Sequence, residues 1–384
     1  MINVANLKGY RFCTLGDVIT LKRGYDLPHN QRLQGEVPVV SSSGITGRHN
    51  TAKVKAPGVV TGRYGTLGEV FYIEEDFWPL NTALYVCDFK GNHPKFISYI
   101  LRTLGLEFQN AAGAVPGINR NVLHKIPIYI PDITTQERIA EILSKYDNLI
   151  DNNNRRIALL EESIHLLYKD WFVRLRFPGY ESVKVVDGIP DGWKIGNLPN
   201  LCSKLIDGTH DSPKPTEEGY YLVTGKHIVN GFIDFTNCYF ISPEEHKKVM
   251  SRSCPEKGDI IFSNIGTLGT TALVDQDFEF SIKNVALFKP LKKYYSSFLY
   301  VYLSNKNTLI SMSQKASGTS QKFFSLKFLR NSDILIPPDD IIIQFDNLVR
   351  PILEQRSLLN KSNQKLKEAR DLLLPRLMNG KITV

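Results

Sequence analysis

Residues with cationic or hydrogen-bonding side chains occur in glycine-containing loops of this 384-residue chain. Arginine and lysine suit phosphate groups, and asparagine, glutamine, serine and arginine can hydrogen-bond to the edges of nucleic-acid bases. Such side chains must reach outward from the loops that connect strands. In the N-terminal half the candidates are Ser41, Ser42, Ser43, Arg48, Arg63, Tyr64, Asn119 and Arg120. In the C-terminal half they are Lys226, His227, Asn264, Lys283, Asn284, Thr319, Ser320, Gln321 and Lys322.

Each candidate also has a structural interpretation. The sequence GTLG, which occurs in both halves, is typical of a hairpin turn in which glycine supplies a positive φ, and it also suits close approach of a loop to a ligand. The serine run can be a solvated turn, Arg63 a surface ion-pair partner, and His227 a structural residue. Asn119 and Arg120 favour ligand contact, because their glycine-containing loop has a counterpart in the loop that holds Gln321.

The sequence carries no recognisable catalytic motif. It contains no G-x-x-x-x-G-K-[S/T] phosphate loop, no G-x-G-x-x-G dinucleotide motif and no Asn/Asp-Pro-Pro-Tyr/Phe segment. The eight histidines lack the spacing of metal ligands. Asp132 and Glu137 resemble fragments of a nuclease site, but no lysine follows them in a usable arrangement. We therefore expect a non-catalytic chain without a metal site.

Composition limits the partners and the compartment. The formal charge is +8 and the pI is about 9.0, which favours a polyanionic partner. The five cysteines form no Cys-x-x-Cys pair, so we expect reduced thiols in the cytoplasm. The N-terminus has no signal-peptide core, and no apolar run approaches the roughly 18 residues that a membrane span needs. The sequence predicts no membrane association.

The element that must position these loops is a long helix over residues 134–172. Thr134 and Glu137 fit a capping box at its start, and Pro178 and Gly179 lie just beyond its end. Apolar residues recur in alternating steps of four and three, which is typical of a coiled-coil seam in which only Asn153 is polar. The seam residues are Ile139, Leu143, Tyr146, Ile150, Asn153, Ile157, Leu160, Ile164, Leu167 and Trp171. A helix of this length, roughly 55 Å, needs a partner helix.

The partner helix lies at the C-terminus. Ile352, Leu359, Leu366 and Leu373 recur every seven residues, and Val349, Asn363 and Leu377 fill the intermediate seam positions. Asn153 and Asn363 either pair inside the seam, which would fix its register, or face solvent. Because proline cannot donate the helical hydrogen bond, we expect this helix to begin or kink near Pro351 and to loosen near Pro375.

The two halves of the chain form an internal repeat. GTLG at Gly65 returns 201 residues later at Gly266, and five further landmarks follow in the same order, ending with the two long helices. Short strands with few helices predict an α+β fold for each half. We expect a first domain over 1–133, a helix over 134–176, a linker over 177–190, a second domain over 191–338, and a helix with a tail over 339–384.

Antiparallel pairing of the two helices would create a pseudo-two-fold axis and hold two unlike domains at a fixed separation. Such an arrangement suits duplex DNA, whose readers bind half-sites a fixed number of base pairs apart. Charged and polar residues outside the seam either are solvated or form a docking surface for helices of a partner. These residues are Arg155, Arg156, His165, Tyr168, Arg356, Lys361, Lys365 and Arg370.

The ordered motifs resemble the specificity subunit of type I restriction-modification systems. They are DGWKIGNLPNLCSKLIDGTHDSP, YYLVTGKHI, the paired GTLG turns, WFVRLRFPG and LLLPRLMNGKI, and together they span essentially the whole chain. The resemblance implies two target-recognition domains separated by two antiparallel coiled-coil spacer helices. The first domain lacks the Gly-Trp pair that opens the second, so equivalence between their early strands is not defined by sequence.

The resemblance also implies the partners. These are double-stranded DNA with an asymmetric bipartite target, two methyltransferase subunits, and restriction subunits with motor activity. The methyl donor and ATP would bind to those partners, so no cofactor is expected on this chain. The alternative is a coiled-coil adaptor that joins two proteins without reading DNA, and sequence-selective, salt-dependent duplex binding would separate the two hypotheses.

Overall fold

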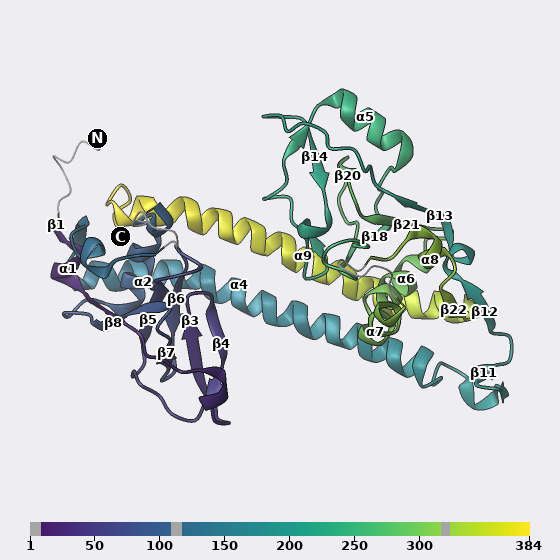
Figure 1. Ribbon diagram of the computed structural model, residues 1–384, viewed down its shortest axis with the longest axis horizontal. Helices are drawn as coiled ribbons and strands as arrows, with labels where there is room; N and C mark the ends of the chain where they lie inside the picture. The colour runs from purple at the N-terminus through teal and green to yellow at the C-terminus, as the bar shows by residue number, and fades with distance from the viewer. Residues whose placement is uncertain (1–8, 109–116, 316–322) are drawn as a thin grey trace. The chain divides into compact units, whose positions relative to one another are not determined.

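The computed structural model describes residues 9–108, 117–315 and 323–384. It divides into a first unit, residues 1–153 and 362–384, and a second unit, residues 154–361. Two long helices, α4 (Ile133–Tyr168) and α9 (Asp339–Met378), are drawn in teal and yellow in Figure 1. Each unit therefore consists of one globular domain and a segment of each long helix.

The first unit is built on two small sheets. The larger is antiparallel with the order β2-β8-β5-β6, and the other has the order β4-β3-β7 with β3 parallel to β7. β1 pairs with β9 in a separate antiparallel ribbon. The strands are β1 (Tyr10–Thr14), β2 (Thr20–Arg23), β3 (Val37–Ser41), β4 (Gly44–His49), β5 (Gly58–Gly62), β6 (Val70–Ile73), β7 (Trp78–Pro79), β8 (Ala83–Asp88) and β9 (Pro127–Pro131).

One short helix, α2 (Pro94–Arg102), packs against the larger sheet, as expected for an α+β domain with few helices. Proline suits the first turn of a helix because its missing N–H would have no helical partner. His93 caps this turn by accepting from the backbone N–H of Phe96. Phe96, Ile97 and Tyr99 are fully buried and form the core with β-strand side chains. The other short helices are α1 (Leu15–Val18), η1 (His29–Gln31), η2 (Leu106–Phe108) and α3 (Arg120–Leu123).

The second unit repeats this architecture. Its larger sheet has the order β13-β21-β18-β19, its second sheet has the order β17-β14-β20 with β14 parallel to β20, and β12 pairs with β22. Its strands are β10 (Val185–Val186), β11 (Ile189–Pro190), β12 (Lys194–Asn197), β13 (Cys202–Asp207), β14 (Tyr220–Val223), β15 (Ile228–Val229), β16 (Phe232–Ile233), β17 (Phe240–Ile241), β18 (Ile260–Phe262), β19 (Thr271–Leu273), β20 (Ser281–Ile282), β21 (Ala286–Pro290) and β22 (Asp333–Ile336).

The strand orders confirm the internal repeat. β2, β8, β5 and β6 of the first unit correspond to β13, β21, β18 and β19 of the second, and β3 with β7 corresponds to β14 with β20. α6 (Tyr295–Ser304) takes the place of α2. The other helices of the second unit are η4 (Tyr180–Ser182), η5 (Leu198–Asn200), η6 (Gly225–His227), α5 (Pro243–Arg252), α7 (Lys306–Gln314) and α8 (Leu326–Arg330). The α+β fold expected for each half is present.

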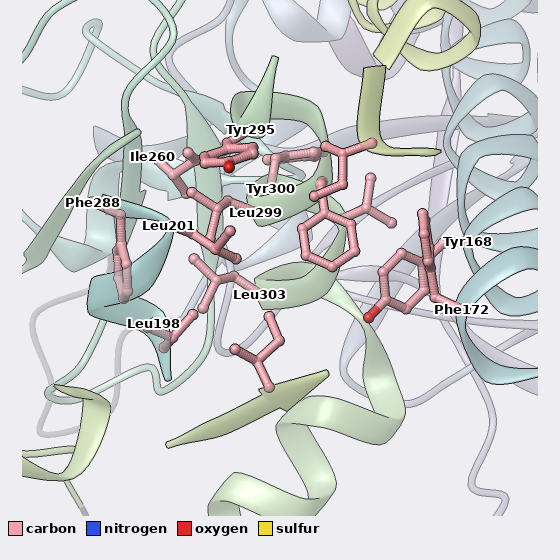
Figure 2. Close-up of a cluster of buried hydrophobic side chains, with 14 of the residues drawn as sticks. Tyr168, Phe172, Leu198, Leu201, Ile260, Phe288, Tyr295, Leu299, Tyr300 and Leu303 are labelled. Carbon is pink, nitrogen blue, oxygen red and sulfur yellow. The ribbon is translucent and has the colours of Figure 1, made fainter. Parts of the chain in front are cut away.

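An aromatic core holds the helix segments to the globular part of the second unit (Figure 2). The Tyr168 ring lies 6.0 Å from that of Phe298, and the Phe172 ring lies 4.9 Å from it. Tyr168 is only 7% exposed. It had been expected among the residues outside the seam, and this expectation is wrong, because the aromatic core has enclosed the ring. Aromatic packing of this kind stabilises a core beyond the area that it buries.

The first long helix begins slightly earlier than expected. α4 starts at Ile133, and the side chain of Asp132 accepts a hydrogen bond from the backbone N–H of Thr135 at 2.8 Å. Asp132 therefore caps the helix, and the capping box expected from Thr134 is wrong. A π-helical turn, η3 (Lys169–Val173), follows α4, and the helix ends before Pro178 as expected.

The second long helix passes through both of its prolines. α9 begins at Asp339 and continues past Pro351 and Pro375, so neither proline starts or ends it. The lost backbone hydrogen bond at Pro351 is offset by apolar packing, since Val349 and Leu353 on either side are buried. Asp339 anchors the first turn by accepting hydrogen bonds from Lys292 and Tyr295 at 2.6 and 2.7 Å. Tertiary contacts therefore decide the bounds of this helix.

Within the first unit the two helices pair antiparallel. Asn153 donates to Asn363 at 2.9 Å, and Arg370 donates to Asp147 at 2.7 Å, so residue numbers fall along α9 as they rise along α4. Both asparagines are buried, which confirms the paired interpretation and excludes the solvent-facing one. In the second unit Glu161 meets Arg356 and Tyr168 meets Phe345, again in antiparallel order.

The asparagine pair should trade stability for register. We expect Asn363→Leu to lower the free energy of unfolding of the first unit by about 1–3 kcal/mol, because the buried Asn153 amide loses the acceptor described above. Adding Asn153→Leu should restore or exceed the wild-type value. Hydrogen exchange of first-unit amides measures both changes, and a double variant less stable than the single one would contradict the expectation.

Candidate nucleic-acid interface

Three loop segments meet around the first GTLG turn. Gly65 and Gly68 have φ values of +82° and +90° between β5 and β6, which confirms the hairpin-turn interpretation. The backbone N–H groups of Arg63 and Tyr64 donate to the carbonyl of Thr82 at 2.8 and 3.1 Å. The N–H of Ile118 donates to the carbonyl of Arg63 at 2.9 Å. Backbone hydrogen bonds thus gather residues 63–64, 81–82 and 117–120.

Arg63 and Tyr64 form a cation–π pair in this cluster. The guanidinium carbon of Arg63 lies 4.3 Å from the centre of the Tyr64 ring, and the pair is partly exposed. Within the part of the chain that the structure describes, Arg63 has no carboxylate at ion-pair distance, so the ion-pair alternative is not observed. A Cβ atom on Gly117 would lie 2.4 Å from the ring, which explains the glycine there. The arginine charge remains available to an anion.

Asn119 and Arg120 stand at the start of α3. The side-chain oxygen of Asn119 accepts from the N–H of Asn121 at 2.9 Å and so caps this short helix. Both residues are exposed, and they follow directly on Ile118, which is bonded to Arg63. The structure therefore brings these two predicted residues beside Arg63 and Tyr64, while their contact with a ligand stays a prediction.

The serine run forms the turn between β3 and β4. Ser41 and Ser42 are each 8% exposed, and the Ser41 hydroxyl bonds to the Ser43 hydroxyl at 3.0 Å. A Cβ atom on Gly62 would lie 3.3 Å from Ser42, so this turn borders the GTLG turn. Only Ser43 is exposed in this run, so the expectation that Ser41 and Ser42 reach outward is wrong, and for these two residues a solvated turn is not observed either, because the turn is packed into the fold.

Arg48 lies further along β4, where its register partner on β3 is Pro38. Its guanidinium is 3.8 Å from the carboxylate of Glu36 and 3.7 Å from that of Glu75. Two carboxylates at this distance offset its charge, and no contact joins Arg48 to the residues gathered around Arg63 in the described part of the chain. Arg48 therefore has a structural explanation that Arg63 lacks.

In the second unit the same loops meet, but Asn264 is buried. It is 3% exposed, and its amide nitrogen donates to Asp207 at 3.3 Å and to the carbonyl of Phe324 at 3.2 Å. The expectation that Asn264 reaches out from a loop is therefore wrong, because its amide joins two neighbouring segments. Burial raises the pKa of Asp207, against the opposing influence of His210.

His227 is also buried. It is 1% exposed, and its Nδ1 accepts from the backbone N–H of Thr224 at 2.9 Å, so its role is structural. Burial lowers the pKa of this histidine, with the Lys226 charge acting in the same direction. Lys226 is exposed. A Cβ atom on Gly225 would lie 2.5 Å from the Ser263 hydroxyl, so this turn borders the second GTLG turn just as the serine turn borders the first.

Lys283 and Asn284 precede β21 and remain partly exposed. Lys283 donates to the Ser212 hydroxyl at 2.6 Å, and Asn284 has a φ of +53°. The side-chain oxygen of Asn284 lies 3.0 Å from Nδ1 of His210. These two predicted residues lie together with Asp207 and His210. The remaining candidates, Thr319, Ser320, Gln321 and Lys322, lie outside the described residues.

Sequence reasoning missed Asp26, Asn81, Asp207 and His210. A glycine at equivalent positions of the two units could have pointed to them. In the first unit no other residue fits at Gly24, because a Cβ atom there would lie 2.2 Å from the carbonyl oxygen of Leu80. Gly208 has the same relation to Ile282 at 2.4 Å. Because both positions require glycine, Gly24 and Gly208 are equivalent, and this equivalence aligns the early strands of the two domains. Sequence comparison alone did not define that alignment.

The helix residues proposed for partner docking differ in exposure and in their neighbours. Arg155, Arg156 and Lys365 are exposed. Arg356 is 3% exposed, so its expected place on an outer face is wrong. Three others already have acidic neighbours: His165 lies 3.3 Å from Glu161, Lys361 lies 3.5 Å from Asp275, and Arg370 lies 2.7 Å from Asp147.

Other kinds of site are not found in the described part of the chain. No group of three or more histidine, cysteine, aspartate or glutamate side chains could hold a metal ion there. All five cysteines are free thiols. Among the described residues, no helix has the length and apolar character needed to cross a membrane. What both units do present is a set of polar loop side chains suited to hydrogen bonding with a ligand.

Residues 8–162 and 190–367 match the family described as the type I restriction modification DNA specificity domain, and the chain belongs to this family. It is 28% identical over 280 residues to the MjaIX type I restriction enzyme specificity subunit of Methanocaldococcus jannaschii, covering 70% of this chain. The alignment spans 63% of the length of that relative. Identity to the HindI specificity subunit of Haemophilus influenzae is 24% over 339 residues, covering 71% of this chain and 73% of the relative.

A solved structure has the same fold. The S subunit of a type I restriction-modification system from M. genitalium matches with a TM-score of 0.61 at 16% sequence identity, and the match covers 97% of each chain. At this identity the match shows the fold alone, and it is the family that agrees with the non-catalytic character that the sequence predicted.

Proposed function

We propose that this chain is the DNA-recognition subunit of a type I restriction-modification complex and that it reads an asymmetric, bipartite duplex target. The observation that carries the proposal is the same loop cluster on the same strand order in both units, filled with different side chains. Arg63, Tyr64 and Arg120 form the cluster of the first unit, and Lys283 and Asn284 belong to that of the second. Unlike side chains at equivalent places would read unlike half-sites.

Charge supports contact with a polyanion. The chain carries a formal charge of +8, and the Arg63 guanidinium is not offset by a described carboxylate. Each phosphate neutralised by a basic side chain releases counterions, so binding should weaken steeply with salt. An adaptor that only joins two proteins would not show this dependence together with sequence selection.

The long helices would serve as spacers and as the docking surface for partners. We propose the five-part division at residues 133, 176, 190 and 338, with target-recognition domains before and after the first spacer. Exposed Arg155, Arg156 and Lys365 would face two methyltransferase subunits, and restriction subunits would join the larger complex. The target base would be flipped into a methyltransferase pocket, and the methyl donor and ATP would bind to the partners. Free thiols fit assembly in the cytoplasm.

Selection from a random duplex library by the chain bound to its methyltransferase subunits tests the proposal. We expect enrichment of two unlike half-sites separated by a constant gap, with an affinity that falls steeply between 50 and 200 mM salt, on the order of 10³-fold for six or more phosphate contacts. Methylation mapped in cells that carry the same complex should fall at the selected sequence. Failure to enrich any sequence would reject DNA readout and favour the adaptor.

A further inference from the structure

A pair of polar side chains occupies the same place in the two units. Gly24 and Gly208 each pack against the strand-end loop that precedes β8 or β21. Two residues after each glycine stands Asp26 or His210, and each faces an asparagine, Asn81 or Asn284. Matching backbone bridges, Tyr25 with Leu80 and Thr209 with Lys283, show that the two places are equivalent.

In the first unit the aspartate orients the asparagine. The amide nitrogen of Asn81 donates to Oδ1 of Asp26. An ionised carboxylate can only accept, so the nitrogen of the Asn81 amide must face Asp26. Asp26 is itself 70% exposed and lies 3.6 Å from Arg23. The side-chain oxygen of Asn81 takes no hydrogen bond from the described residues and is not buried, so it is an acceptor open to a ligand.

In the second unit the asparagine is turned the other way. Its side-chain oxygen faces Nδ1 of His210 at 3.0 Å, and an oxygen can only accept, so Nδ1 donates. The other ring nitrogen of His210 lies 3.5 Å from Asp207, and the histidine side chain is 52% exposed. The amide nitrogen of Asn284 has no described acceptor and is not buried, so it is a donor open to a ligand.

The fold does not depend on these side chains. The backbone already joins the loops, because the N–H of Asn284 donates to the carbonyl of Thr209 at 3.2 Å and the N–H of Tyr25 donates to that of Pro79 at 2.8 Å. In the first unit the guanidinium of Arg63 donates to the backbone carbonyl of Asn81 at 3.3 Å, which places this asparagine inside the loop cluster. Partly exposed amides held by a fixed neighbour suit recognition.

We infer that Asn81 and Asn284 are specificity-determining residues of opposite hydrogen-bond polarity, with Asp26 and His210 as their positioning residues. Asn81 accepts from an exocyclic amine, which adenine and cytosine carry at the major-groove edge. Asn284 donates to N7 or O6 of guanine, N7 of adenine or O4 of thymine. The inference rests on the proposed function and assigns one base contact to each half-site.

Reversing the polarity of one asparagine tests the inference. Asn284→Asp keeps the shape of the side chain and a residue type that tolerates positive φ, but it offers only oxygens. In library selection with the full complex, this variant should shift one position of the second half-site toward cytosine or adenine. The relative affinity there should change roughly 5- to 150-fold, the range for one mismatched base pair in a specific site. The first half-site should not change.

Variants of Asp26 in the first unit and of Asn284 in the second provide further tests and a matched control. Asp26→Asn lets the neighbouring amide turn over and should relax one position of the first half-site only, whereas Asp26→Glu should retain the preference. Asn284→Gly should lose discrimination in the second half-site without strain. Unchanged hydrogen exchange would verify the fold of each variant. If the wild type selects a bipartite site and every variant keeps the same base preferences, the inference fails while the proposed function stands; no selection by the wild type rejects the function itself.

Discussion

Replacing Arg356 by methionine is expected to lower the free energy of unfolding of the second unit by about 2–4 kcal/mol, because a partly buried carboxylate loses the partner that is itself buried. Nε of Arg356 lies 2.7 Å from Oε2 of Glu161, and the arginine is 3% exposed. The guanidinium also donates to the carbonyl of Asn230 at 3.0 Å and lies 4.0 Å from the centre of the Phe232 ring. One residue thus joins α4, α9 and the globular part of this unit.

Amide hydrogen exchange distinguishes a loss of stability in the second unit from a loss of stability in the whole chain. Amides of α6 and of the second-unit part of α9 should lose protection in Arg356→Met, while amides of β5 in the first unit serve as the internal reference. Arg155→Met, an exposed arginine on α4, is the matched control and should stay within about 0.5 kcal/mol of wild type. Adding Glu161→Leu to Arg356→Met should recover much of the loss, since an apolar pair can replace a buried ion pair. An unaffected single variant would contradict the expectation.

The same pair gives a sign for the pH dependence. Burial raises the pKa of Glu161, but hydrogen bonding with His165 and the charge of Arg356 outweigh burial and hold that pKa below its usual value of 4.5. A carboxyl group with a lowered folded-state pKa contributes stability that is present above the unfolded pKa and is lost as the pH falls through the folded value. The wild-type second unit should therefore lose stability in acid below about pH 4.5, and Arg356→Met should weaken this dependence, because the hydrogen bond with His165 remains.

Much of the scaffold could be predicted from periodicity and order. Alternating apolar residues predicted the strands, and the repeated GTLG turn predicted the duplication, because these patterns follow directly from which face of an element is buried. Asn153 and Asn363 were predicted as a possible seam pair and do pair. That α9 continues through Pro351 could not be predicted, since buried neighbours outweigh the local effect of this proline.

The seam positions of Arg356 and Arg370 could have been recognised from their spacing, but only apolar residues were used to define the seam. Steps of seven from Val349 to Leu377 pass through Arg356, Asn363 and Arg370, so both arginines stand on the same seam. Each meets an acidic residue of α4 within its own unit, Glu161 for Arg356 and Asp147 for Arg370. Charged residues at seam positions were interpreted as an outer face, because sequence alone does not show which acid lies opposite.

The candidate interface was only partly predictable for a related reason. Backbone hydrogen bonds between segments far apart in the chain bring Arg63, Tyr64 and Asn119 together, and these bonds carry no side-chain signature. Asn264 and His227 have the residue types of readers but are buried. Residue type and loop position predicted the candidate residues, and burial then shows which of them have a structural role.

Arg63→Ala is expected to weaken recognition of the first half-site, because the variant removes a cation that no described carboxylate offsets. Loss of one arginine contact to a base typically costs about 1–3 kcal/mol, or roughly 5- to 150-fold in affinity, and relaxes specificity at that position. A phosphate contact would instead weaken all sequences equally and reduce the salt slope by about one. Affinity for duplexes altered in one half-site, measured at several salt concentrations, distinguishes these two roles.

The first unit contains its own control for this experiment. Arg48→Ala removes the same kind of side chain from the same unit, but Arg48 is flanked by Glu36 and Glu75 and lies outside the Arg63 cluster. We expect Arg48→Ala to change affinity for either half-site by no more than about threefold, since exposed ion pairs contribute 0–1 kcal/mol. Because each half-site would be read by a separate domain, Arg63→Ala should leave discrimination within the second half-site intact. Equal losses of discrimination at both half-sites, or a larger effect from Arg48→Ala, would contradict reading by separate loop clusters.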